Sequence, residues 1–384
     1  MTNTNPNSAD IEKWLALIRA ESVGPITFAR LLSHFGTIDS VLGASVGQLA
    51  QVDQIGSRTA EQIARTRTSF DSNPELELAD KLGVWIINLH DDRYPPVLKR
   101  IYDPPPVLYI KGTLTSSDNL AVAIVGCRRC SSYGAEQASR FGHLLASAGF
   151  TIVSGMARGI DTAAHQGALA AAARTIAVQG CGLAKVFPPE NEKLFHLIAE
   201  SGCCISELPL QYEPLPENFP PRNRIIAGLA LATIIIEAPY RSGALFTAAA
   251  AMENNREVMA VPGKIDSPLN RGAHQLIKQG AKLLESVEDV MEALGYIGGQ
   301  LKDHTADAAQ KAGQKAEQPL FQLSQLNLSD AEQKIYNCLD SEPLHLDHIV
   351  EQTSLAAGPV NASLVSLQLK GLVKQLPGNM FRRR

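Results

Sequence analysis

The 384-residue sequence has no segment that predicts a membrane span or secretion. Its longest apolar run, residues 225–236, is interrupted by Gly228 and is too short to cross a bilayer. Residues 1–10 are polar and lack the basic and then apolar order of a signal peptide. We therefore expect a cytoplasmic protein that makes no membrane contact.

Positive charge and cysteine are also scarce. Lys and Arg number 35 against 39 Asp and Glu, giving a net charge of −4, so any nucleic-acid surface must be a local patch. Cys127 and Cys130 have a C-x-x-C spacing, but the adjacent Cys203 and Cys204 have the wrong spacing for a second pair of metal ligands. The sequence therefore predicts reduced cysteines and no metal site.

Common catalytic and cofactor motifs are missing. No G-x-x-x-x-G-K-[ST] string occurs, which argues against a P-loop NTPase. The turn after residues 121–125 contains Gly126, Cys127, Arg128 and Arg129 in place of the G-x-G-x-x-G of a dinucleotide site. A nucleophile elbow and a metal-spaced histidine cluster are also absent. We expect a protein without a cofactor that is not an enzyme.

A phosphate-binding turn is predicted at residues 154–165, SGMARGIDTAAH. This stretch lies between an apolar run and an alanine-rich segment, as expected for a turn from a buried strand into a helix. Gly155 and Gly159 allow a tight bend and a close backbone approach, and Arg158 adds a fixed positive charge. Backbone amides at a helix N-terminus together with a guanidinium suit a phosphate.

Three carboxylates and one histidine each permit a catalytic and a structural interpretation. Asp161 and His165 are one helical turn apart and are either an acid–base pair or, as we favour, a structural pair in which Asp161 orients the turn and His165 hydrogen-bonds to it. Glu207 and Glu237, at predicted strand ends, are either general bases or residues that hold neighbouring arginines.

The central part of the chain alternates between strand and helix patterns. The predicted strands cover residues 121–125, 151–153, 175–178, 203–206, 233–236 and 257–260. The predicted helices cover residues 135–148, 160–172, 192–200, 224–230 and 244–254. This alternation predicts a mostly parallel Rossmann-like sheet, with strand-like runs at 84–87 and 107–110 extending its edge. Basic residues follow four of the six strands, so we expect an electropositive crevice at their carboxyl ends.

Smaller modules are predicted on both sides of this sheet. Residues 23–32 and 55–63 repeat an apolar residue, a glycine and a helix, which resembles a helix-hairpin-helix used for DNA binding or for packing alone. Helical patterns at 332–339, 346–353 and 360–371, with a hairpin at 372–384 turning at 377–379, predict a winged helix, used either for DNA contact or for protein docking. The expected domains are a helical SAM-like or helix-hairpin-helix-like domain at 1–75, a Rossmann-like DNA-binding domain at 80–297, a flexible linker at 298–324 and a winged-helix domain at 325–384.

A second cluster combines an aromatic ring with positive charge. Phe219 follows a proline-rich loop that we expect to hold it at the surface, and Arg222 and Arg224 flank Asn223 just before a predicted helix. Single-stranded nucleic acid needs this combination, because cations follow the backbone while a ring stacks on a base. The alternative is that Phe219 is the hydrophobic plug of its own loop.

Together these strings resemble the DNA-processing protein A family (DprA, also called Smf). The resemblance rests on VGCR at 125–128, SGMARGID at 154–161 with AH at 164–165, FPPRNRIIAG at 219–228, SGAL at 242–245 and VPG at 261–263. It implies a homodimer that binds and protects single-stranded DNA during natural transformation and loads the RecA recombinase onto it. Lysines common in the family are replaced by Pro189 and Pro216, and Arg129, Lys185 or Lys193 are the candidates to compensate.

The resemblance also implies roles for individual residues. Arg128 would contact phosphate, the Arg158 turn would line the pocket, and Phe219 would stack on a base beside Arg222 and Arg224. The complete predicted DNA-binding set is Arg128, Arg129, Gly155, Arg158, Gly159, Lys193, Phe219, Arg222, Asn223 and Arg224. The predicted dimer contacts are His274, Leu276, Ile277 and Leu283.

Two other functions compete with this one. A nucleotide-processing hydrolase on a similar sheet would carry a P-G-G-x-G-T-x-x-E motif, whereas SGALFT at 242–247 lacks the carboxylate. A structural scaffold for other recombination factors would have no DNA affinity.

Overall fold

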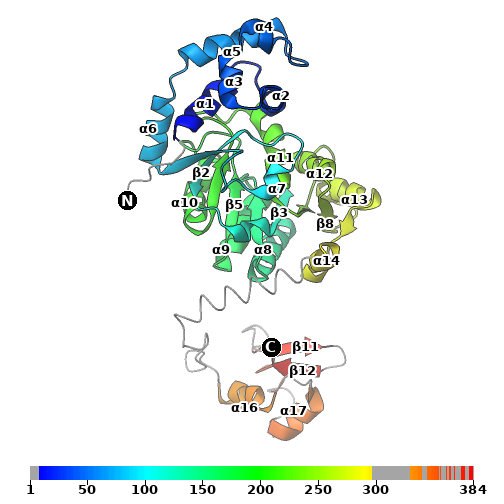
Figure 1. Cartoon of the computed structure of the whole chain (residues 1–384). Helices are drawn as coiled ribbons and strands as arrows, with labels where there is room; N and C mark the ends of the chain where they lie inside the picture. Colours follow the sequence, from blue (N-terminus) through cyan, green and yellow to red (C-terminus); the bar gives the residue numbers. More distant parts are fainter. Residues whose placement is uncertain are drawn as a thin grey trace. The chain divides into compact units, whose positions relative to one another are not determined.

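A computed structural model describes residues 8–295, 329–339, 344–353, 373–376 and 380–383, together with positions 355, 360, 363, 364 and 367. The chain divides into two compact units, Met1–Ala308 and Ala309–Arg384. Figure 1 shows the elements of both units. The predicted linker at 298–324 and the hairpin tip at 377–379 lie outside the described residues.

Six helices precede the sheet. They are α1 (Ser8–Ile18), α2 (Pro25–Phe35), α3 (Ile38–Gly43), α4 (Val46–Leu49), α5 (Ser57–Ser69) and α6 (Asn73–Leu82). The predicted repeat is present, since Gly24 and Gly56 are the N-cap residues of α2 and α5. Their buried side chains share one core with the sheet, in which Trp14 and Phe28 are clustered with Tyr109. The core of the N-terminal helices is therefore continuous with that of the sheet.

The sheet has nine strands in the order β1-β2-β6-β5-β4-β3-β7-β8-β9. Their bounds are β1 (Val84–Asn88), β2 (Val107–Gly112), β3 (Ala121–Gly126), β4 (Thr151–Ser154), β5 (Thr175–Val178), β6 (Cys203–Ser206), β7 (Ala232–Ile236), β8 (Glu257–Ala260) and β9 (Lys282–Leu283). The seven strands β6-β5-β4-β3-β7-β8-β9 pair in parallel with their neighbours. Strands β1 and β2 add an antiparallel edge beside β6. The six predicted strands and the edge extension are confirmed.

Helices cover both faces of this sheet, because alternate residues of each strand point to opposite sides. In β3, Ala123 and Val125 join one core cluster, whereas Val122 and Ile124 join another. The first cluster lies under α7 (Pro96–Lys99), α11 (Phe219–Leu229), α12 (Gly243–Glu253) and α13 (Arg271–Lys278). The second lies under α8 (Ser132–Ser147), α9 (Ile160–Ala170) and α14 (Val287–Ala293), with α10 (Glu192–Ser201) beside α9.

Helix α11 begins earlier than predicted. It starts at Phe219 and not at residue 224, with Pro220 and Pro221 in its first turn. Proline is well suited to this turn because the first amides of a helix have no intrahelical partner. Pro220 and Pro221 therefore belong to the helix, and Phe219 is fixed on its first turn.

The strand order creates a crevice between β3 and β7. From β3 the chain proceeds outward through β4, β5 and β6, and then returns to the other side of β3 as β7. The helices that follow these two neighbouring strands, α8 and α12, lie on opposite faces of the sheet. In open parallel sheets, ligands bind at the carboxyl edge where the strand order reverses in this way.

The C-terminal unit is a small helix and sheet module. Its described elements are α16 (Asp330–Cys338), β10 (Leu344–His345), α17 (Leu346–Thr353), β11 (Val373–Leu376) and β12 (Met380–Arg383). The strands pair in the order β10-β12-β11, and Ile335, Ile349 and Phe381 share a buried cluster. The winged-helix prediction is confirmed. Within the described parts of the chain, no helix combines the length and the apolar character needed to cross a membrane.

Candidate functional site

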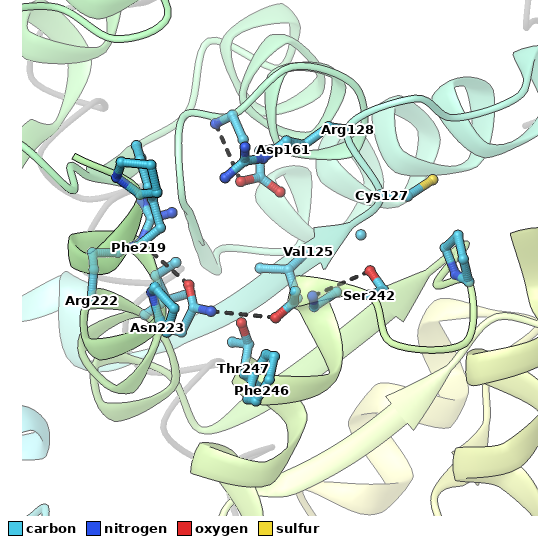
Figure 2. Close-up of a pocket in the computed structure, with 18 residues that line it drawn as sticks. Val125, Cys127, Arg128, Asp161, Phe219, Arg222, Asn223, Ser242, Phe246 and Thr247 are labelled. Carbon is cyan, nitrogen blue, oxygen red and sulfur yellow. Dashed lines mark hydrogen bonds between the residues drawn. The ribbon is translucent and has the colours of Figure 1, made fainter. Parts of the chain in front are cut away.

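A hollow of about 310 Å³ lies at the crevice between β3 and β7 (Figure 2). It is built from the β3–α8 turn, the first turns of α11 and α12, and the turn before α9. The lining residues include Val125, Gly126, Cys127, Arg128, Ala157, Asp161, Pro216, Phe219, Arg222, Asn223, Pro239, Ser242, Gly243, Phe246 and Thr247. Its position and size match those of small-ligand sites in folds of this class.

Phe219 and Arg128 form one wall of this hollow. The Arg128 guanidinium lies 5.1 Å from the centroid of the Phe219 ring, within the range of a cation–π contact. The Phe187 ring lies 5.6 Å from Phe219, and the same pair of rings lines a smaller neighbouring hollow. Because its contacts come from other loops, Phe219 is not simply the plug of its own loop. Arg128 is exposed and forms no ion pair with any described residue.

Arg222, in contrast, is turned into the protein. Its side chain donates hydrogen bonds to the carbonyl oxygens of Gly155, at 2.6 Å, and Val178, and the residue is 5% exposed. A side chain at position 155 would place its Cβ 2.7 Å from both Arg222 Nη2 and Asp161 Oδ2. Burial lowers the pKa of Arg222 to about 10, opposed by the Asp161 charge. Arg222 therefore braces the ends of β4 and β5, and Gly155 leaves room for it.

The two residues that follow Arg222 are also held internally. Arg224 forms ion pairs with Asp103, at 3.0 Å, and Glu207, and 13% of its side chain is exposed. The Asn223 amide donates to the Gly243 carbonyl oxygen at 3.3 Å. The structure therefore does not leave Arg222 and Arg224 as two available cations beside Phe219. Sequence reasoning missed this because both arginines lie on a helix whose interior partners come from distant strands.

The remaining predicted basic residues fall into two groups. Arg158 is exposed and donates a hydrogen bond from Nε to Glu190, and Lys185 pairs with Glu213. Arg129 and Lys193 are exposed and have no ion-pair partner among the residues that the structure describes. The edge of the sheet is thus basic at a few positions and neutralised by carboxylates at others.

Gly159 joins two of the turns that surround the hollow. Its φ of +78° is in the left-handed region that favours glycine, and a Cβ there would lie 2.5 Å from the Cys127 carbonyl oxygen. The turn before α9 therefore packs directly on the turn after β3. Arg158 and Arg128 extend from these two packed turns.

Two predictions about buried polar residues are wrong and two are right. The Ala157 amide donates to Asp161 at 3.3 Å, as expected for a carboxylate that orients the turn, but His165 Nδ1 pairs with Thr175 Oγ1 at 2.7 Å and not with Asp161. Glu207 holds Arg224 as predicted, whereas Glu237 accepts hydrogen bonds from the Ser131 amide and hydroxyl and holds no arginine. Burial raises the pKa of Asp161 to about 6 and lowers that of His165 to about 3.

Phe246 is a lining residue that sequence reasoning missed. It lies on α12, across the hollow from α11, and 60% of its surface is exposed (Figure 2). A large aromatic in an otherwise alanine-rich helix was the signal that could have identified it. The adjoining loop also contains Glu237 and Arg241 with φ values of 48° and 73°. Such left-handed residues other than glycine cost energy and concentrate at functional sites.

The predicted dimer residues lie on α13 and the edge strand β9. Leu276 is 6% exposed and packs in the core, and the His274 ring contacts the Gly263 backbone, at 3.1 Å from its oxygen. Ile277 is partly buried, whereas Leu283 is 41% exposed. Two of the four side chains are thus used to hold α13 in place.

The described ranges contain no cluster of three His, Cys, Asp or Glu side chains that would hold a metal ion. All six cysteines, which lie within these ranges, are free thiols. Burial, reinforced by Glu237, raises the pKa of Cys127 to about 12, so this thiol in the hollow stays protonated at neutral pH.

Three family models match the chain. The model described as DNA recombination-mediator protein A matches residues 85–295, the DprA winged helix domain matches 314–379, and the DprA-like N-terminal HHH domain matches 8–64. The chain is 37% identical to Protein Smf of Synechocystis sp., over 97% of this chain and 98% of the relative. It is 33% identical to Protein Smf of Escherichia coli, over 98% and 96% of the two chains. The X-ray structure of DNA processing protein A from Streptococcus pneumoniae is similar with a TM-score of 0.65 and 35% identity, over 73% of this chain and 97% of that one.

Proposed function

The chain belongs to the DNA recombination-mediator protein A family, and we propose that it binds single-stranded DNA at the hollow between β3 and β7. The observation that carries this proposal is the exposed Arg128 guanidinium on the Phe219 ring. An unpaired cation attracts the phosphodiester backbone, and an accessible ring stacks on a base of any sequence. Bases of a duplex are stacked on each other, so this combination favours single strands.

The roles of the predicted DNA-binding residues follow from their surroundings. We assign backbone contacts to Arg128, Arg129 and Lys193, because these are exposed and unpaired among the described residues. Arg222, Asn223 and Arg224 support the site by holding α11 and the strand ends, and Gly155 and Gly159 shape the turn. Arg158 borders the smaller hollow with its charge partly neutralised by Glu190.

The binding partners beyond DNA are proposed from the family resemblance. A homodimer would form at α13 and β9, where Leu283 is exposed on an edge strand that has no further strand beside it in the described sheet. The DNA-bound dimer would protect incoming DNA and load the RecA recombinase onto it during natural transformation. Catalysis is not part of the proposal, because Asp161, the carboxylate that lines the hollow, accepts a hydrogen bond from the Ala157 amide and orients the turn.

A binding experiment tests the DNA proposal directly. Fluorescence anisotropy would compare a labelled dT oligomer with a duplex of equal length over a range of salt concentrations. We expect tighter binding to the single strand, with log affinity falling against log salt by about 0.7 per phosphate contacted. Equal or tighter binding to the duplex, or no binding, would contradict it. Release of free base from a nucleoside monophosphate would instead support the hydrolase alternative.

The recombinase proposal needs a separate measurement. Light scattering or a fluorescent RecA would report filament growth on an oligomer already coated with single-strand binding protein. We expect the wild-type protein to shorten the lag before filament growth. An unchanged lag, despite tight DNA binding, would leave the DNA proposal standing and remove the loading function.

A further inference from the structure

A second hollow, of about 790 Å³, opens at the same carboxyl edge of the sheet. It lies between the start of α8 and the segment that follows β8. The lining residues are Ser131, Ser132, Tyr133, Glu237, Pro262, Gly263, Lys264, Ser267 and Asn270. None of these residues lines the hollow beside Phe219, and nothing in the function proposed above uses them.

The two hollows are neighbours because the same two loops contribute to both. The loop after β3 gives Gly126, Cys127 and Arg128 to the first hollow and Ser131, Ser132 and Tyr133 to the second. The loop after β7 gives Pro239 and Ser242 to the first and Glu237 to the second. Strands β3 and β7 are adjacent, so their loops form a common wall. A chain leaving one hollow reaches the other by crossing this wall.

The common wall is suited to such a crossing. Tyr240 and Arg241, in the loop after β7, are exposed, with 64% of the Tyr240 surface accessible. No described residue forms an ion pair with Arg241. An exposed ring and a guanidinium without an ion-pair partner among the described residues thus lie in this loop between Pro239 and Ser242, which line the first hollow, while Glu237 of the same loop lines the second.

The second hollow repeats the chemistry of the first. Tyr133 is 44% exposed, and its hydroxyl donates to the Pro262 carbonyl oxygen at 3.0 Å, which fixes the ring. Lys264 is exposed and has no ion-pair partner within the described ranges. The Glu237 carboxylate accepts hydrogen bonds from the Ser131 amide, at 2.7 Å, and hydroxyl, so its charge is directed into the protein. A fixed ring and a free ammonium are again the features that single-stranded nucleic acid requires.

We propose that the second hollow holds a further nucleotide of the same DNA strand, with its base on Tyr133 and a phosphate at Lys264. This inference rests on the proposed function. It adds that the DNA path does not end at Phe219 but continues over the loop after β7 toward α13. Binding to a longer oligomer would then involve contacts that a very short oligomer cannot make.

Length dependence separates the two positions. Anisotropy with dT oligomers of increasing length would be measured for wild type, Phe219→Ala, Tyr133→Ala and Lys264→Ala. Phe219→Ala should weaken binding at every length. Tyr133→Ala should weaken binding at least about fivefold for long oligomers. It should have no effect on the shortest oligomer that wild type still binds.

Matched controls protect this result from a folding artefact. Tyr133→Phe keeps the stacking ring and removes only the hydrogen bond to Pro262, so it should retain most of the wild-type affinity. Tyr102→Ala removes an exposed ring whose backbone contacts Asn254, at the end of α12 opposite Phe246, and should also bind like wild type. Lys264→Ala changes an exposed side chain and gives a second readout if Tyr133→Ala proves unstable.

Photocrosslinking provides the positional test. Oligomers with a single 5-iodouracil at successive positions would be irradiated on the wild-type protein, and the modified peptides identified by mass spectrometry. We expect one position to label the Phe219 or Phe246 peptide and a different position of the same oligomer to label the Tyr133 peptide. Failure of the wild-type protein to bind any oligomer would contradict the proposed function itself. Tight binding that is unchanged in Tyr133→Ala and Lys264→Ala at all lengths, without Tyr133 labelling, would overturn only the second position.

Discussion

Two arginine-containing segments look alike in the sequence and differ in the folded protein. Arg128 and Arg129 follow β3, and Arg222 and Arg224 lie on α11, each pair close to the Phe219 hollow. Folding leaves the first pair exposed without ion-pair partners among the described residues. It directs the second pair to backbone carbonyls and carboxylates. Charge near a ligand site therefore has two separate uses, to build the site and to bind the ligand.

The difference follows from where each arginine begins. A side chain on the first turn of a helix between two packed layers is surrounded by strand ends, whose carbonyl oxygens need donors. Arg222 supplies those donors to Gly155 and Val178. A side chain in the open turn after a strand has solvent on most sides. Mutations of Arg222 or Arg224 should therefore reduce stability, and mutations of Arg128 or Arg129 should reduce DNA binding.

Replacement of Arg222 should have the largest effect. Arg222→Ala leaves two buried carbonyl oxygens and Asp161 without their partner, and we expect a loss of about 3–5 kcal/mol in unfolding free energy. Urea unfolding followed by the fluorescence of Trp14 and Trp85, the two tryptophans of the chain, would measure it. Arg128→Ala is the matched control and should change stability by less than about 0.5 kcal/mol. Similar stability losses in Arg222→Ala and Arg128→Ala would contradict the distinction between an arginine that supports the fold and one that is available to a ligand.

Removal of the Phe219 ring should have the next largest effect, a loss of affinity for single-stranded DNA. Phe219→Ala should weaken single-stranded DNA binding by about 1–3 kcal/mol, because a stacking surface is lost. Phe219→Trp keeps such a surface and should retain most of the affinity. Phe246→Ala, measured in parallel, would show whether the second ring of the hollow contributes. Unchanged affinity in both alanine variants would place the DNA elsewhere.

Much of the fold was predictable from local pattern. Short β-branched runs bounded by turn residues located the six strands from β3 to β8, and their alternation with helices indicated a parallel sheet. The start of α11 was not found because Pro220 and Pro221 suit both a loop and a first helical turn. Local sequence did not distinguish these possibilities.

The candidate site was harder to predict than the fold. The residues that form it were largely named, including Phe219 and Arg128, but their exposure depends on partners far along the chain. Arg222 meets Val178, 44 residues away, and Glu237 meets Ser131, 106 residues away. The second hollow joins residues 131–133 with residues 262–270 in the same way. Sequence patterns identify residue types suited to DNA, and tertiary contacts decide which of them remain available.

The salt dependence of binding should sharpen the distinction between the two arginine pairs. Arg128→Gln removes one phosphate contact and should reduce the slope of log affinity against log salt by about 0.7. Arg224→Gln breaks the pairs with Asp103 and Glu207 and should leave the slope of the folded protein unchanged. Anisotropy titrations at four or more salt concentrations would give both slopes. A reduced slope in Arg224→Gln would mean that this arginine reaches DNA after all.

The pH dependence of stability tests the role of the buried residues near Arg222, through His165. Its pKa is lowered to about 3 by burial and the nearby Arg222 charge, so the folded state keeps it neutral while the unfolded chain takes up a proton near pH 6.5. Its contribution to stability is therefore present above this pH and is lost as pH falls toward 3. Between pH 7.5 and 6.0 the unfolding free energy should therefore fall by about 0.8 kcal/mol less in His165→Asn than in the wild type. Asp161, whose raised pKa of about 6 acts in the opposite direction, remains in both proteins.

The smallest expected effect concerns Arg158. This residue is exposed like Arg128 but forms an ion pair like Arg224. Its guanidinium donates to Glu190, and both side chains are about half exposed. Glu190→Gln should release the cation for phosphate and increase single-stranded DNA affinity about two- to fivefold, with a steeper salt slope. Glu213→Gln is the matched control, since it releases Lys185 in the same way at a residue that lines neither of the two Phe219 hollows. Equal gains in both variants would indicate a general effect of charge, whereas a gain confined to Glu190→Gln would place Arg158 on the DNA path and show that exposure alone does not make a cation available.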